Sequence, residues 1–86
     1  MPRVLTIGRT TVAADQREGF LARVAARRAH YTKAGVRYWV FEEASLPGAF
    51  VEFCEASDPD TLVAAHNAAP DPPTGINRPY VELEAR

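Results

Sequence analysis

The chain has little of what marks disulfide-bonded or membrane proteins. Its 86 residues contain one cysteine, Cys54, which excludes an internal disulfide framework and fits a reducing compartment. No apolar run approaches the roughly 20 residues of a membrane-spanning helix, and the amino terminus lacks the apolar core of a signal peptide. We therefore expect a cytoplasmic protein without a membrane partner.

The chain also has no excess of positive or negative charge, and its histidines and cysteine do not show the spacing of metal ligands. Ten basic and eleven acidic residues nearly cancel, which argues against nucleic acid as a partner. The basic cluster Arg23, Arg27 and Arg28 is predicted to be the solvated side of a helix. Only two histidines are present, far apart in the chain and without paired ligand spacing, so no metal is expected. No cofactor is expected either, because no redox group is encoded.

What the chain does contain is a regular succession of strand-like and helix-like segments. Alternating apolar residues predict four strands, at 3–9, 36–43, 49–56 and 80–84. Helical spacing predicts two helices, from Asp15 to about Lys33 and from Ser57 to about Asn67. A loop at 68–79 is too rich in proline for regular structure. The β-α-β-β-α-β order predicts one α+β domain over 1–86, a ferredoxin-like sandwich with a four-stranded antiparallel sheet.

Right-handed crossovers place both helices on one face of such a sheet. Alternation then sorts the strand residues into two sets. We expect the helices to cover Leu5, Ile7, Trp39, Phe41, Val51, Phe53, Val81 and Leu83. The set expected to face away from them is Val4, Thr6, Tyr38, Val40, Glu42, Phe50, Glu52, Cys54, Tyr80 and Glu82. This second set is too apolar to face water, so we predict a homodimer, paired sheet against sheet around a lined cavity.

In element order and spacing, residues 3–84 resemble the dimeric α+β barrel superfamily, most closely its antibiotic-biosynthesis-monooxygenase-like members. Two segments add to the likeness: Phe50-Val51-Glu52-Phe53-Cys54-Glu55, an aromatic-rich third strand, and residues 57–66, similar to a short helix ending in Ala-His. The resemblance implies a homodimer with a small-molecule pocket between each sheet and its helices or loops. Relatives include cofactor-free oxygenases, haem-degrading oxygenases and isomerases. The haem-degrading relatives use an Asn, a Trp and a helix His together, and no Asn stands on the first strand here.

Three residues are candidates for catalysis. His66 is a potential general base because its ordinary pKa lies near neutrality, although a helix-end residue or a dimer contact is the alternative. Glu52 would have a raised pKa in an apolar cavity and could transfer protons, or it could pair with Arg3, Arg9 or Arg37 instead. Tyr38 offers a phenolic hydrogen-bond donor, or it packs across the subunit seam.

Five further residues are candidates for binding a small hydrophobic ligand: Tyr80, Glu42, Phe50, Asn77 and Arg78. Tyr80 joins an apolar ring to a hydroxyl, while Glu42 and Phe50 belong to the same predicted inner face as Glu52. Asn77 and Arg78 end the proline-rich loop, where they could engage a carboxylate or carbonyl group. A plain connector is the alternative for this loop.

Two functions remain open from the sequence. One is a cofactor-independent monooxygenase or isomerase that acts on a hydrophobic or aromatic carbonyl compound. The other is a non-catalytic binding or structural dimer module whose cleft is filled by its own side chains. A pocket of several hundred cubic ångströms with converging polar groups would favour a ligand site, whereas a filled interior would favour the structural module.

Overall fold

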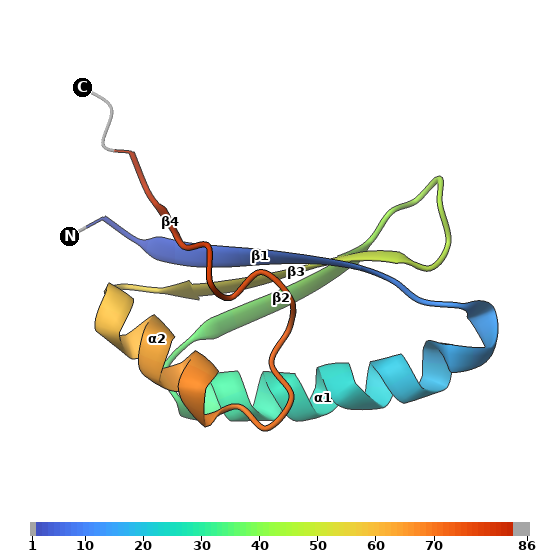
Figure 1. Cartoon of the computed structure of the whole chain (residues 1–86), viewed down its shortest axis with the longest axis horizontal. Coiled ribbons are helices and arrows are strands. Elements are labelled where there is room, and N and C mark those ends of the chain that lie inside the picture. The colour runs from blue at the N-terminus through green and yellow to red at the C-terminus, as the bar shows by residue number, and fades with distance from the viewer. Residues whose placement is uncertain (1, 84–86) are drawn as a thin grey trace.

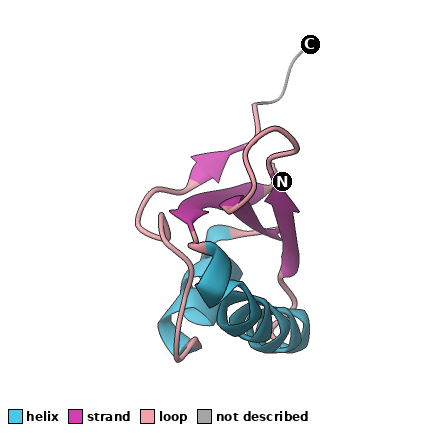
Figure 2. Cartoon of the chain, turned by 90° about the vertical axis from the view of Figure 1, so that its right-hand side faces the viewer, coloured by secondary structure: helices cyan, strands magenta, loops and turns pink. Residues whose placement is uncertain are grey.

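Two helices lie beneath one face of a four-stranded antiparallel sheet in the computed structural model, which describes residues 2–83 (Figures 1 and 2). The strands are β1 (Val4–Thr11), β2 (Arg37–Glu42), β3 (Ala49–Ala56) and β4 (Tyr80–Val81). The helices are α1 (Arg17–Lys33), which follows a 3-10 turn at Ala14–Gln16, and α2 (Pro59–Ala68). All six predicted elements are present, although β4 is short and the predicted end of its strand, Glu84, lies outside the described residues.

The strand order is β2-β3-β1-β4, with β1 and β3 at the centre of the sheet. This order and the placement of both helices on one face confirm the predicted ferredoxin-like α+β fold. Local sequence explains where the helices begin and end. Gly35, with φ of +80°, supplies the left-handed residue that follows α1. Asp58 accepts a hydrogen bond of 2.8 Å from the backbone N–H of Thr61 and so caps α2, with Pro59 in the first turn.

The predicted assignment of the sheet faces is wrong for β1, β2 and β3. Alternation sorts their residues correctly into two sets, but the helices cover the set that was expected to face away from them. The buried members of that set are Val4, Thr6, Tyr38, Phe50, Glu52 and Cys54. The physical reason is that α1 and α2 supply partners for the polar members: Arg27 hydrogen-bonds Glu52 and His66 hydrogen-bonds Thr6. The more polar set is therefore the buried one.

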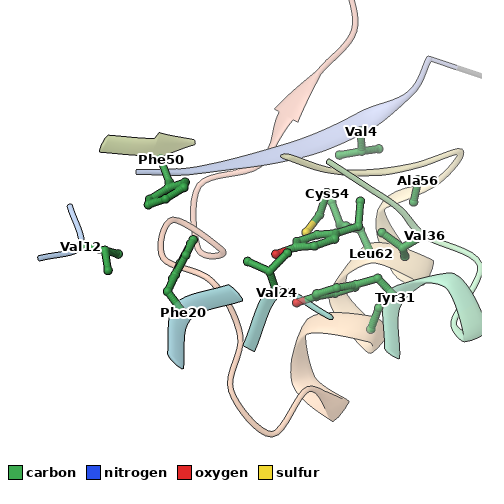
Figure 3. Packing of buried hydrophobic residues seen from close by; sticks show 12 residues of the cluster. Val4, Val12, Phe20, Val24, Tyr31, Val36, Phe50, Cys54, Ala56 and Leu62 are labelled. Carbon is green, nitrogen blue, oxygen red and sulfur yellow. The ribbon is translucent and has the colours of Figure 1, made fainter. Parts of the chain in front are cut away.

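Aromatic side chains form much of the core between the sheet and α1. The rings of Phe20 and Phe50 have centroids 4.4 Å apart, and Figure 3 shows them facing each other. Tyr31 from α1 stacks on Tyr38 from β2 at 5.5 Å. These contacts fill the space between the sheet and α1, where the resemblance to the superfamily implies a small-molecule pocket. Neither helix is long and apolar enough to cross a membrane.

The face of the sheet opposite the helices carries an apolar surface. We call it the outer face, defined by Leu5, Ile7, Trp39, Phe41, Val51 and Phe53. Trp39 is 42% exposed and Phe41 is 56% exposed. No helix of the described residues covers this surface, as Figure 1 shows. An uncovered apolar face was predicted, and the structure places it on the more apolar of the two residue sets.

At one end of the outer face Glu55 is only 5% exposed, although it is charged. Arg3 lies 3.5 Å and Arg37 3.7 Å from its carboxylate. Two arginines flanking one carboxylate partly compensate the lost hydration of that group. The outer face therefore has an apolar middle and a charged end.

Candidate functional site

A buried ion pair lies between the sheet and α1. The Arg27 guanidinium donates to both carboxylate oxygens of Glu52, at 2.8 and 3.0 Å. Glu52 is 1% exposed, and the Arg27 side chain is 10% exposed. The Tyr38 hydroxyl also donates to Glu52. We call Arg27, Glu52 and Tyr38 the ionic cluster.

The ionic cluster corrects one prediction and settles one alternative. Arg27 is not on the solvated side of its helix; it stands on the same stripe as the buried Phe20, Val24 and Tyr31. Glu52 does pair with an arginine, but with this one and not with those of the strands. Burial, and then the hydrogen bond to Glu52, raise the pKa of Tyr38. The predicted catalytic residues Tyr38 and Glu52 are thus hydrogen-bonded to each other, and Glu52 is also paired with Arg27.

The second polar group is centred on His66, on the face of α2 turned to the sheet. Its Nδ1 lies 2.9 Å from the Tyr31 hydroxyl, and its Nε2 lies 3.0 Å from the Thr6 hydroxyl. His66 is 5% exposed. Burial, and then the proximity of His30, lower the pKa of the imidazole below its ordinary value. His66 is therefore held neutral and in one orientation.

Cys54 lies beside this group, where it interacts with Thr6 and Tyr31. The thiol is fully buried, and burial raises its pKa to about 12. A thiol with such a pKa is almost entirely protonated near neutrality and is a poor nucleophile. Cys54 therefore acts as a small packing residue.

A pocket of about 230 Å³ opens next to His66. It lies between α2, β1 and the loop that follows α2. Its apolar wall includes Val4, Leu62 and Ile76, and its polar groups include Thr6, His66 and Asn77. We call it the histidine pocket. Its lining, mostly apolar with a few placed polar groups, is that of a ligand site, although its volume lies below the range of about 300–1,000 Å³ that is usual for such sites.

The structure brings together only some of the predicted site residues. His66 and Asn77 share the histidine pocket, whereas Tyr38 and Glu52 lie in the ionic cluster and do not line it. Asn77, Arg78 and Tyr80 line a different hollow, beside β1. The predicted site is therefore divided among separate places.

Glu42 and Phe50 pair with each other near the turn between β2 and β3. Glu42 accepts hydrogen bonds of 2.6 and 2.8 Å from Arg17 and one of 2.9 Å from the backbone N–H of Gly48. These bonds, those of Arg17 first, lower the pKa of Glu42 to about 2. Phe50 is buried against Phe20. Both residues thus have structural partners, and neither reaches His66.

Sequence reasoning missed Thr6, Tyr31 and Arg27 as members of the two polar clusters. The sequence does indicate that Arg27 faces the core, because it interrupts an apolar stripe at helical spacing. Val24 stands three residues before it and Tyr31 four residues after it. The sequence gives no such indication for Thr6 and Tyr31, since they stand 60 and 35 residues from His66 in the sequence.

Comparisons with known proteins agree on the fold. The sequence matches no protein-family model and no curated protein at a significant level. A crystal structure of a conserved protein from Methanosarcina mazei Go1 matches with a TM-score of 0.72 and 17% identity, over 79% of this chain and 69% of that one. This likeness shows the fold alone.

Two crystal structures of SnoaB, a cofactor-independent oxygenase from Streptomyces nogalater, match at higher identity. One has a TM-score of 0.60 and 26% identity, over 81% of this chain and 71% of that one. The other, of a variant with one asparagine replaced by alanine, has a TM-score of 0.57 and 28% identity, over 79% and 69%. With the sheet order described above, these matches confirm the resemblance to the dimeric α+β barrel superfamily.

The neutral state of His66 predicts a dependence of stability on pH. Since the folded pKa lies below the unfolded value of about 6.5, the unfolded chain binds the extra proton first as pH falls. The contribution of His66 to the free energy of unfolding should be constant above about pH 7.5 and should decrease from there to about pH 5, mostly above the range in which carboxylates titrate. Chemical denaturation at several pH values measures this slope.

The slope should flatten in His66→Gln. It should persist with a smaller amplitude in His30→Gln, which removes the lesser cause of the lowered His66 pKa and keeps the larger cause, burial. Equal slopes in His66→Gln and the unchanged protein would contradict the assignment of a neutral buried His66.

Proposed function

We propose that this chain is a small-molecule-binding protein whose ligand occupies the histidine pocket, and that it catalyses cofactor-independent oxygenation. The observation that carries the proposal is the placement of a neutral, oriented imidazole on the wall of an otherwise largely apolar pocket. The likeness to SnoaB, itself a cofactor-independent oxygenase, supports the reaction class.

His66 is the proton acceptor in this proposal. The working tautomer has the Nδ1–H donating to the Tyr31 oxygen, which leaves the Nε2 lone pair to accept from Thr6 or from a substrate. Nε2 removes a proton from an acidified carbon next to a carbonyl group. A histidine with a lowered pKa remains unprotonated at neutral pH and is ready for this step.

The substrate must supply the electrons, since this chain contributes none. In an anthrone-like compound, deprotonation of the CH₂ group gives an electron-rich carbanion that reduces dioxygen. One oxygen atom becomes the new carbonyl and the other leaves as water, so that CH₂ and O₂ give C=O and H₂O. The apolar wall of the histidine pocket suits the body of such a substrate, and the Asn77 side chain lies where it can bind a carbonyl oxygen.

A structural dimer module is the second candidate, and one observation favours it. The space directly between the sheet and α1 is filled by aromatic rings and by the ionic cluster. No buried side-chain polar atom of the described residues is without a hydrogen-bond partner. Such an interior is complete without a ligand, and on this alternative the histidine pocket would be an incidental hollow.

Oxygen uptake with a panel of anthrones and quinols tests the proposal. We expect stoichiometric consumption of dioxygen and a carbonyl product with at least one member of the panel. His66→Gln should lower the turnover rate by about 10²–10⁴-fold, the usual contribution of a general base, and His30→Gln should retain it.

Two measurements report ligand binding separately from turnover: native mass spectrometry, and NMR shifts of the His66 ring when panel members are added. Binding without oxygen uptake would contradict the oxygenase and retain the ligand site. A chain that neither consumes oxygen nor binds any member of the panel would contradict both and favour the structural module.

The proposed assembly is a homodimer that pairs two outer faces. An apolar surface of this extent, with Trp39 and Phe41 exposed, is typical of an interface. Two-fold pairing lets each apolar middle meet its copy and leaves the charged Arg3–Glu55–Arg37 ends towards the rim. The resemblance to a superfamily known for dimers supports the same arrangement.

Sedimentation at micromolar concentration tests this assembly. The unchanged protein should sediment with twice the mass of the 9.4 kDa chain, because burial of the outer face stabilises the dimer. Phe41→Glu should shift it to the monomer, since each subunit would bury an unpaired carboxylate in the proposed interface. The matched control Leu21→Glu changes an exposed apolar residue on α1 and should leave the dimer intact. A folded monomer of the unchanged protein would contradict the proposal.

A further inference from the structure

A second hollow, of about 650 Å³, lies beside β1 at the edge of the outer face. Its floor and walls include Ile7 and Arg9 from β1, Tyr80 from β4, and Ile76, Asn77 and Arg78 from the loop before β4. We call it the arginine hollow. It is separate from the ionic cluster, and it meets the histidine pocket only through the loop residues Ile76 and Asn77, which line both.

The charges in the arginine hollow are all of one sign. Arg9 and Arg78 both line it, and no lining residue is acidic. Five other arginines of the described residues form ion pairs with carboxylates, namely Arg3, Arg17, Arg23, Arg27 and Arg37. Neither Arg9 nor Arg78 does so within residues 2–83. Two cations that share a concave surface without a carboxylate attract an anion.

Apolar surface lies next to these charges. Ile7 and Ile76 are half-buried, and Tyr80 is 48% exposed. An inorganic anion would gain nothing from the apolar surface of these three side chains, whereas a ligand with an apolar body would bury it. Arginine also holds a carboxylate through two parallel hydrogen bonds, which orients the rest of the ligand.

The loop wall of the hollow is fixed against β1. Gly75 has φ of +78°, and a Cβ built there would lie 2.2 Å from the Ile7 carbonyl oxygen. The Thr74 hydroxyl donates to the Arg9 carbonyl at 3.1 Å. Further back, the Nε of Arg27 donates to the Asp71 carbonyl at 2.8 Å and ties the loop to α1. In Figure 1 this loop runs from the helix layer up to the edge of β1. A wall held in this way loses little conformational entropy when a ligand binds.

From this combination we infer that the arginine hollow binds a small carboxylate with an apolar, preferably aromatic, body. The carboxylate pairs with Arg9 and Arg78, Asn77 donates a further hydrogen bond, and the body lies on Ile7, Ile76 and Tyr80. The inference does not depend on the proposed oxygenase activity. A ligand here shares the wall of Ile76 and Asn77 with the histidine pocket, so occupancy of one site can alter the other.

Backbone-amide NMR titration of the full chain tests the inference, with benzoate, benzamide and inorganic phosphate as probes. Benzoate should shift the amides of residues 7–9 and 74–78 at lower concentration than either other probe. Benzamide, which lacks the charge, should bind about tenfold more weakly, as expected for loss of a charge-assisted hydrogen bond. Phosphate, which lacks the apolar body, should also bind more weakly than benzoate.

Two variants and one control assign the binding to this hollow. Arg9→Gln and Arg78→Gln should each weaken benzoate binding by about tenfold. Arg28→Gln removes the same charge from α1, outside the hollow, and should leave the affinity unchanged. Equal affinity for benzoate and benzamide, equal affinity for benzoate and phosphate, or equal loss in all three variants would overturn the inference. Since none of these readings uses dioxygen or His66, failure here is distinguishable from failure of the proposed reaction.

Discussion

The Arg27–Glu52 ion pair is the constraint on which the arrangement of this molecule depends. Glu52 lies in the middle of β3 and points to the helices, where an unpaired carboxylate would be very unfavourable. Arg27 reaches it from the third turn of α1, and the Tyr38 hydroxyl satisfies a further lone pair. Together these contacts make it possible for the helices to cover the more polar face of the sheet.

The consequences extend to both surfaces of the sheet. Because the helices take the polar face, the more apolar outer face has no helix over it within residues 2–83, and it is the surface that we propose to pair in the dimer. Because the ionic cluster and the aromatic rings fill the space between the sheet and α1, the pocket on the helix side of the sheet lies towards α2, where His66 borders it. Arg27 also holds the carbonyl of Asp71, and so one side chain links the core to the loop that forms part of both hollows.

The sequence was sufficient for the fold but only partly sufficient for the site. Element order follows from local patterns, since alternation marks strands and helical spacing marks helices, and the topology rules then leave few choices. Alternation defines two faces without saying which one a helix covers. Which face the helices cover depends on Arg27, which stands 25 residues from Glu52 in the chain. The sequence indicated this only through the position of Arg27 on an apolar stripe. His66 was predicted as a reactive residue, but its partners Thr6 and Tyr31 come together only in three dimensions.

A double-mutant cycle on the ion pair tests the account most directly, by denaturant unfolding at matched protein concentration. Arg27→Met should cost about 3–5 kcal/mol, because it leaves a buried carboxylate unpaired. Adding Glu52→Gln, which keeps an acceptor for Tyr38, should restore more than half of this loss, while the control Arg17→Met, at an exposed ion pair, should cost a small fraction of it. A cost for Arg27→Met no larger than that of Arg17→Met, unchanged by Glu52→Gln, would contradict the account.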